Sequence, residues 1–367
     1  MYLLFSIPIA KKKIAVCREK KNCPCKPILV GWSPAKIGDP GKGNPETTYR
    51  EALRQALTDS MRRDPSIVIL GEEVGKYGGA YGVTKGMLDE FGDARVRDTP
   101  ISEEVIVGTA VGAAMTGLRP VAELMYVDFV TLAMDQLVNQ AAKIRYMFGG
   151  QIGVPMVLRS QGGTGRSGAA QHSQSLEAWM MHTPGLHLAM PSTVTDAYHL
   201  LMHALTLNDP VVFLEHKGLY TMKGELKPER ALPWGKAEVR RKGGDCTLVS
   251  YSRMVHFCLD AADSLSKEGI EAEVIDLRTL HPLDMDTVSE SVSRTGRAMV
   301  VTEDCLTAGV SAEISARIME EAFDFLEEPV LRLSGEDIPI PVSPELEKGS
   351  VPSVDRIIST AKMLMRR

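Results

Sequence analysis

The segment 98–104 carries a carboxylate in a setting that suits acid/base chemistry. It reads Asp-Thr-Pro-Ile-Ser-Glu-Glu and precedes an apolar run that contains Gly108 and Gly112. We expect Ser102 to cap a helix there and Glu103 to lie in its first turn, where a carboxylate complements the helix dipole. Glycine is unfavourable inside a helix unless another backbone or a flat ligand approaches closely. Judged by itself, Glu103 is therefore a carboxylate that complements the helix dipole. The glycines indicate that another backbone or a flat ligand packs closely against this helix.

Two further segments hold polar groups suited to catalysis. Glu72 and Glu73 run into the glycine- and tyrosine-rich stretch 77–82, a composition typical of a mobile loop over a site. The alternative is a solvated turn. His172 lies in Ala-Ala-Gln-His-Ser-Gln and is either an acid/base group or a polar loop residue.

The stretch 163–168 satisfies the spacing G-x-G-x-x-G and follows a predicted strand. A dinucleotide site needs a helix that opens directly on the glycines and an acid about twenty residues further on. Here five residues intervene before any helix, and no acid lies between Glu177 and Asp196. A flexible loop that exposes its backbone is the favoured interpretation.

The pattern of apolar residues predicts a parallel sheet covered by helices. Helical spacing over residues 48–64 and 132–147 alternates with short apolar runs that predict strands. These predicted strands cover residues 66–70, 120–125, 154–158, 186–190 and 211–214. Ligands of such sheets lie beyond the carboxyl ends of the strands, so we expect the site in the loops after the first three.

A second alternating set begins after an aperiodic stretch. Its predicted strands cover residues 247–250, 272–276, 298–302 and 330–333, and its helices include 255–267, 310–325 and 354–365. We predict an α/β fold of two doubly wound domains, at 46–220 and 239–367, joined by a linker at 221–238. Residues 1–45 hold nine Lys or Arg and two acids, and we predict a disordered extension outside the fold.

The composition, with 44% hydrophobic and 24% charged residues, is that of a globular protein. A net charge of -5 gives no basic field for nucleic acid, and no stretch is long enough to span a bilayer. We therefore expect a small-molecule substrate and neither a nucleic-acid nor a membrane partner. Six cysteines without a paired framework favour a reducing compartment, and we expect a cytoplasmic protein.

Taken together, several motifs resemble the β chains of thiamine-diphosphate-dependent 2-oxoacid dehydrogenase complexes, and the resemblance covers nearly everything after residue 46. The motifs are Gly71-Glu-Glu-Val, Asp98-Thr-Pro-Ile-Ser-Glu, Val111-Gly-Ala-Ala, Gly117-Leu-Arg-Pro, Ala169-Ala-Gln-His-Ser-Gln, Asn208-Asp-Pro-Val and Glu273-Val-Ile-Asp-Leu-Arg. The segments 123–129, 145–150 and 215–220 look closest to acetoin dehydrogenase β chains. Leu132 stands where pyruvate-type members carry a glutamine, which disfavours a pyruvate substrate.

This resemblance implies a transketolase-type fold, with a pyrimidine-binding domain followed by a transketolase C-terminal-like domain. Glu103 then binds N1' of the aminopyrimidine ring, where a protonated ring favours the imino tautomer that takes the proton from thiazolium C2. Phe129 stacks on that ring, and Glu72 and Ile101 line the cofactor cleft. His172 faces the reactive carbon and hydrogen-bonds the substrate carbonyl or the acyl acceptor.

The resemblance also implies ions and partners. A potassium site built mainly from backbone carbonyls would involve Met156, Ala204, Leu205, Leu207 and Asp209; the alternative is an ordinary helix C-terminus. The Gly-Asp-Gly anchor for diphosphate and Mg²⁺ occurs nowhere in this sequence. By resemblance it lies on an α subunit in an α2β2 heterotetramer, which passes the acyl group to lipoamide on a dihydrolipoyl acyltransferase core.

Three alternatives stay open at this point. Within the same class, the substrate is pyruvate or a branched-chain 2-oxoacid instead of acetoin. From another class, the chain is a non-catalytic assembly subunit that tethers α to the acyltransferase core. A free-standing nucleotide oxidoreductase is the third.

Overall fold

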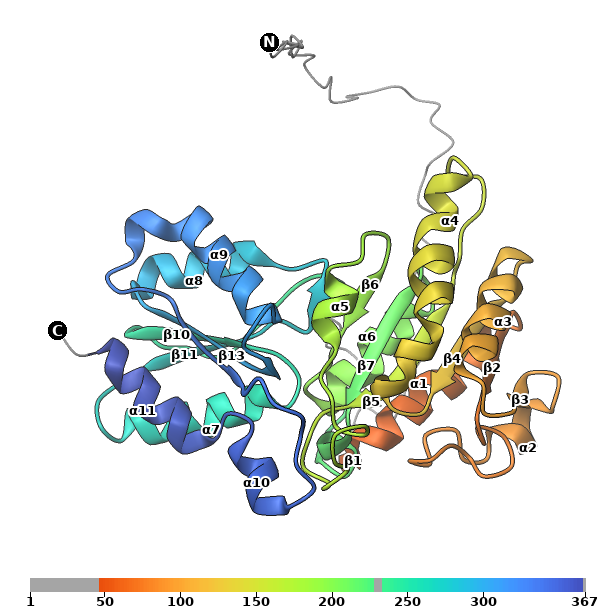
Figure 1. The fold of residues 1–367 in the computed structure, drawn as a ribbon, viewed down its shortest axis with the longest axis horizontal. Helices are drawn as coiled ribbons and strands as arrows, with labels where there is room; N and C mark the ends of the chain where they lie inside the picture. The colour runs from red at the N-terminus through yellow and green to blue at the C-terminus, as the bar shows by residue number, and fades with distance from the viewer. Residues whose placement is uncertain (1–45, 228–232, 366–367) are drawn as a thin grey trace, which may run out of the picture. The chain divides into compact units, whose positions relative to one another are not determined.

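The computed structural model describes residues 46–227 and 233–365 of the 367-residue chain. The predicted extension 1–45 lies outside the described residues. Two sheets, each covered by helices, dominate the described part (Figure 1). The predicted α/β class is confirmed.

The first sheet has seven strands in the order β12-β6-β7-β5-β4-β2-β3. Its strands are β2 (Ile67–Gly71), β3 (Val96–Asp98), β4 (Arg119–Leu124), β5 (Val157–Gly162), β6 (His187–Ala189), β7 (Val211–His216) and β12 (Thr279–His281). Neighbouring strands pair in parallel except β12, which runs antiparallel to β6. Most residues of β4, β5 and β7 are buried, as expected for parallel strands with helices on both faces.

Helices of the first half follow the predicted alternation. They are α1 (Tyr49–Arg63), α2 (Met87–Phe91), α3 (Glu103–Met115), α4 (Ala142–Met147), α5 (Glu177–Met181) and α6 (Val194–Ala204). At α1, Thr48 and Glu51 form a capping box, and the helix ends at Asp64, the residue before a proline.

The prediction of one continuous α-helix over residues 132–147 is wrong. The chain instead forms a 3-10 helix η1 (Val127–Ala133), a π-helical turn η2 (Asp135–Ala141) and then α4. The apolar pattern alone does not separate these geometries, because the buried residues Ala133, Leu137 and Ala141 recur at a spacing of four that also suits an α-helix. The π-turn lies against α3, where a Cβ on Gly108 would come within 3.4 Å of Gln136 Oε1.

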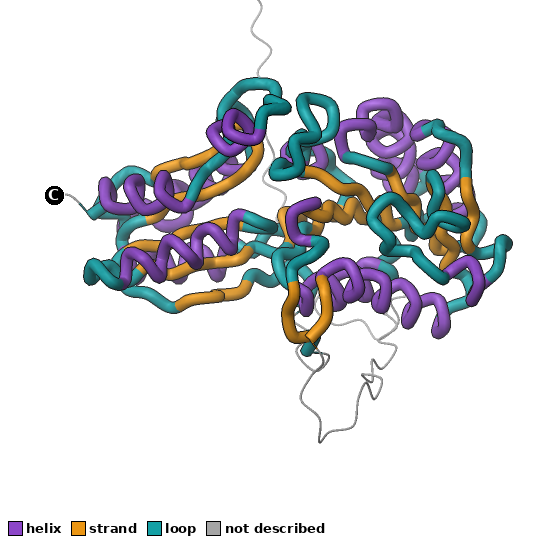
Figure 2. The backbone as a smooth tube through the Cα atoms, turned by 90° about the horizontal axis from the view of Figure 1, so that it is seen from below, coloured by secondary structure: helices purple, strands orange, loops and turns teal. Residues whose placement is uncertain are grey.

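The second sheet has five strands in the order β14-β13-β10-β11-β9. They are β9 (Glu238–Arg241), β10 (Cys246–Ser250), β11 (Ala272–Asp276), β13 (Ala298–Cys305) and β14 (Leu331–Gly335), with only β9 antiparallel. Helices α7 (Met254–Ser266) and α11 (Val354–Leu364) cover one face, and α8 (Met285–Thr295), α9 (Val310–Ala322) and the turn η4 (Phe323–Phe325) the other. Figure 1 shows these strands between the two helical layers, and Figure 2 shows helices in front of the strands when the molecule is seen from below. Helix α10 (Pro344–Gly349) precedes α11.

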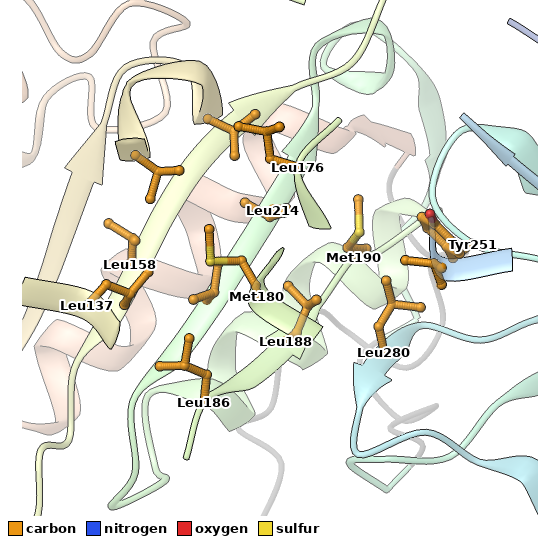
Figure 3. Close-up of a cluster of buried hydrophobic side chains, with 14 of the residues drawn as sticks. Leu137, Leu158, Leu176, Met180, Leu186, Leu188, Met190, Leu214, Tyr251 and Leu280 are labelled. Atoms are coloured by element: carbon orange, nitrogen blue, oxygen red, sulfur yellow. The ribbon is translucent and has the colours of Figure 1, made fainter. Parts of the chain in front are cut away.

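Two strand pairings connect segments that the sequence analysis placed in different parts of the chain. Strand β12 follows β11 in the chain yet completes the first sheet. Strand β8 (Lys223–Glu225), inside the predicted linker, pairs with β1 (Glu46–Thr48). The core is also continuous, since Tyr251 and Leu280 pack in one cluster with Leu188 and Met190 (Figure 3). The domain limits at 220 and 239 stay a prediction.

Among residues 46–227 and 233–365, no helix combines the length and apolar character that a bilayer crossing requires.

Candidate functional site

The segments that follow the carboxyl ends of β2, β3, β4 and β5 hold the residues predicted for catalysis and cofactor binding. Glu72 follows β2 and Phe129 lies in η1 after β4, while His172 comes ten residues after the end of β5. Because parallel strands end at the same edge, these loops share one side of the sheet. The position of the site at this edge stays a prediction.

Glu103 and Glu72 lie close together at this edge. Glu103 is the first residue of α3 and is half-buried. The pKa of Glu72 is raised, first by burial and then by the neighbouring charges of Glu103 and Glu73. The predicted capping bond of Ser102 is wrong: Ser102 occupies the N-cap position with extended backbone, but its side chain makes no capping hydrogen bond.

Exposed apolar side chains flank Glu103 in the chain, and another lies on η1, which packs against α3. Ile101 is 73% exposed, Val105 57% and Leu132 59%. Large apolar side chains at this exposure are expected where a ligand or another chain covers them. Ile101, predicted to line a cleft, thus stands on an uncovered surface beside the carboxyl pair.

Phe129 and His172 come together as predicted residues of one site. Their ring centres lie 5.4 Å apart in an edge-to-face arrangement. Tyr126 lies on another side of the imidazole, at 4.8 Å and also edge-to-face. Tyr126 has a φ of 68°, a conformation that a non-glycine residue adopts only when its surroundings enforce it. Its backbone N–H donates to Gln161 Oε1 at 3.2 Å.

The glycine-rich loop 163–168 does not expose its backbone donors as expected. Thr164 N donates to Glu303 Oε1 at 2.6 Å, and Gly165 N donates to Glu347 Oε1 at 2.8 Å. Ser167 N donates to Glu347 Oε2 at 3.0 Å. The amides that a dinucleotide phosphate would need are therefore occupied by the protein's own carboxylates, which argues against nucleotide binding at this loop.

A buried contact between His216 and Glu303 supports the same loop. His216 Nε2 lies 2.9 Å from Glu303 Oε2, and both side chains are nearly inaccessible to solvent. Burial alone would raise the pKa of Glu303, but His216 holds it well below its usual range. A Cβ on Gly163 would lie 2.1 Å from His216 Nε2, so only glycine fits there.

The buried side chain of Arg159 connects three neighbouring strands of the first sheet. The Arg159 guanidinium on β5 bonds Glu123 on β4 and Glu215 on β7, each at 2.7 Å. Tyr220 Oη donates to the second oxygen of Glu215 at 2.5 Å. Each buried charge thus has a partner, and the network fixes the strand ends from which the site loops depart.

The residues predicted for a potassium site gather at the opposite edge, where β5 and β7 begin. Arg119 Nη1 donates to the carbonyls of Leu205 and Leu207 at 3.2 and 2.8 Å. A K⁺ ion on these carbonyls would share them with a guanidinium of the same charge. The remaining three groups are also bonded: Val211 N donates to Met156 O, Leu207 N to Ala204 O, and Arg145 pairs with Asp209. The arrangement does not favour K⁺ with Arg119 in this position, and the site stays a prediction.

The structure adds residues that the sequence did not single out. Lys217, the residue directly after β7, donates from Nζ to the carbonyl of His172. Glu303 and Glu347 come from more than 130 residues further along the chain. Among residues 46–227 and 233–365, no cluster of three or more His, Cys, Asp or Glu is arranged to hold a metal ion.

Comparison with protein families gives two adjacent matches. Residues 45–223 match the pyrimidine binding domain of transketolase, and residues 235–357 match the transketolase C-terminal domain. Among solved structures, a split-gene transketolase described as an inactive β4 tetramer superposes with a TM-score of 0.74 over 86% of this chain and 98% of its own. At 21% identity, this likeness establishes the fold alone.

Curated relatives are more similar in sequence. The pyruvate dehydrogenase E1 component subunit beta-2 of Oryza sativa is 48% identical, over 86% of each chain. The beta subunit of acetoin:2,6-dichlorophenolindophenol oxidoreductase from Cupriavidus necator is 46% identical, over 86% of this chain and 96% of its own. The 2-oxoisovalerate dehydrogenase subunit beta of Bacillus subtilis is 42% identical, over 86% and 98%.

Proposed function

The chain belongs to the transketolase-like family formed by the β subunits of thiamine-diphosphate-dependent 2-oxoacid and acetoin dehydrogenases, and we propose that it supplies half of an active site that an α subunit completes. The pair cleaves acetoin or decarboxylates a 2-oxoacid and transfers the acyl group to lipoamide. The observation that carries the proposal is the carboxyl pair Glu103 and Glu72, with the exposed side chains of Ile101 and Val105 on either side of Glu103 in the chain.

These residues fit the aminopyrimidine end of thiamine diphosphate. Glu103 would hold a proton toward a ring nitrogen, and Phe129 would contact the ring face. Glu72, the carboxyl beside Glu103, has its pKa raised first by burial and then by the charges of Glu103 and Glu73. When bound, the cofactor supplies the carbon nucleophile that the reaction needs. His172 would donate a hydrogen bond to the substrate carbonyl or to the acyl acceptor.

An α subunit explains two further features. Tyr146 is 88% exposed, and Met147 and Phe148 beside it at the end of α4 are also open, so this segment presents apolar surface to another chain. The sequence lacks the Gly-Asp-Gly anchor, so the Mg²⁺ and diphosphate ligands belong to the partner in an α2β2 heterotetramer. We further propose a cytoplasmic location, a dihydrolipoyl acyltransferase core as acyl acceptor, and domains at 46–220 and 239–367.

Acetoin is the favoured substrate because the segments 123–129 and 215–220 resemble acetoin dehydrogenase chains, whereas the relatives include pyruvate and branched-chain enzymes at similar identity. The test is co-expression with the candidate α subunit, followed by lipoamide acylation with acetoin, pyruvate and a branched-chain 2-oxoacid in parallel. Thiamine-diphosphate-dependent turnover of one of them supports the proposal and names the substrate. An assembled pair that binds no thiamine diphosphate and turns over none would leave the chain as a scaffold.

A further inference from the structure

A buried lysine contacts the His172 loop from the side of β7. Lys217 opens the 3-10 turn η3 (Lys217–Leu219) directly after β7, and it is 1% exposed. Its Nζ donates to the backbone carbonyl of His172 and lies 5.3 Å from the centre of the Tyr126 ring. Burial lowers the pKa of Lys217, while Asp128 opposes that shift. An ammonium group is costly to bury, so its retention at this place calls for a function.

The backbone of Lys217 is fixed on both sides. His216 before it is paired with Glu303, and His216 Nδ1 accepts a hydrogen bond from Gly218 N at 3.0 Å. The carbonyl of Lys217 accepts from Arg166 Nη2 at 3.4 Å. The ammonium therefore extends from a base fixed by these contacts toward the segment that carries His172.

The segment that Lys217 holds is strained. Ser167 and Ala169, shortly before His172, have φ values of 52° and 59°. Non-glycine residues keep such conformations only when contacts around them enforce it. Glu347 holds Ser167 at the start of this segment, whereas Lys217 bonds the carbonyl of His172 itself.

Polar atoms around the same segment are buried without partners among the described residues. They are Ser173 Oγ, Asp128 Oδ2 and Gln161 Nε2. The second polar atom of Asp128 and of Gln161 is engaged locally: Asp128 Oδ1 accepts from Gln174 N at 3.1 Å, and Gln161 Oε1 accepts from Tyr126 N at 3.2 Å. Buried polar atoms normally find a partner, so the segment around His172 has polar groups that its own backbone and side chains do not pair.

We propose that Lys217 is a positioning residue for His172. Its ammonium fixes the His172 carbonyl and, through the face of Tyr126, the ring that borders the imidazole. The lysine has no contact with substrate in this role and acts on the reaction only through His172. The inference rests on the proposed function, in which His172 contacts the substrate or the acyl acceptor.

The test uses the assembled α/β pair and four variants: Lys217→Met, His172→Ala, the double variant, and Lys223→Met on exposed β8 as the matched control. Lys217→Met is expected to lower kcat for lipoamide acylation about tenfold or more, the effect of losing a hydrogen bond to a charged group. The dissociation constant for thiamine diphosphate and the activity of Lys223→Met should not change. On the His172→Ala background, Lys217→Met should cause no further loss, because its effect passes through the missing ring.

Two outcomes would overturn the inference: full activity of Lys217→Met, or an undiminished loss when it is added to His172→Ala. If Lys217→Met does not assemble, Lys217→Arg and Lys217→Gln are compared instead. Arginine keeps a cationic donor and should retain a higher kcat than the neutral glutamine. Equal activities of these two variants would refute the role. Wild-type activity of His172→Ala alone would instead refute the role of His172 in the proposed function.

Discussion

Glu177 offers a pH-dependent test of the packing between the two halves. It is the first residue of α5, is almost fully buried, and accepts a hydrogen bond from Tyr251 Oη at 2.9 Å. Burial, with a further contribution from Asp304, raises its pKa from 4.5 to about 8. Between these values the folded chain keeps a proton that the unfolded chain has lost. The stability of the fold therefore falls as pH rises through this window.

Glu177→Gln removes this dependence, because glutamine resembles the protonated acid and still accepts from Tyr251. One proton corresponds to about 1.4 kcal/mol per pH unit. Allowing for partial ionisation near pH 8, the variant should gain about 2 kcal/mol over wild type between pH 6 and pH 8. Urea unfolding of the full-length chain at both pH values measures the difference, with Glu104→Gln on exposed α3 as control. A difference that stays constant, or that shrinks as pH rises, would refute the reasoning.

Two further predictions concern the loop 163–168. Gly163→Ala should abolish soluble, folded protein or lower its melting temperature sharply, since the added Cβ would overlap His216 Nε2 and the residue has a φ of 82°; an unchanged melting curve contradicts this packing. Glu347→Gln should speed tryptic cleavage after the exposed Arg166 while leaving global unfolding nearly unchanged, because it weakens the bonds to Gly165 and Ser167. Cleavage at the wild-type rate would show that the carboxylate does not hold the loop.

The elements with strong local signals could be predicted from sequence. Helix α1 has an apolar face, a capping box at Thr48 and a following proline, and its structure matches the prediction. The position of Glu103 in the first turn of α3 was also predicted correctly from the sequence. Strand β12 was not, because three residues of an antiparallel edge carry no recognisable period.

Long-range contacts explain the remaining misses. Lys217 follows the apolar run of β7, and the residues next to it in the sequence do not indicate that this lysine is buried against His172. Glu347 looks like a surface acid of a short helix, yet it accepts from amides some 180 residues away. Such partners depend on the assembled tertiary structure, which local propensity does not encode.

The comparison of Glu103→Gln with Glu104→Gln in the assembled α/β pair tests the central claim most directly. Both residues lie in the first turn of α3, but only Glu103 lies beside Glu72 in the proposed cofactor site. The account predicts that Glu103→Gln loses lipoamide acylation by a factor of about 100 or more, with the pair still assembled and Glu104→Gln fully active. Full activity of Glu103→Gln would contradict the shared active site and leave the chain as an assembly subunit.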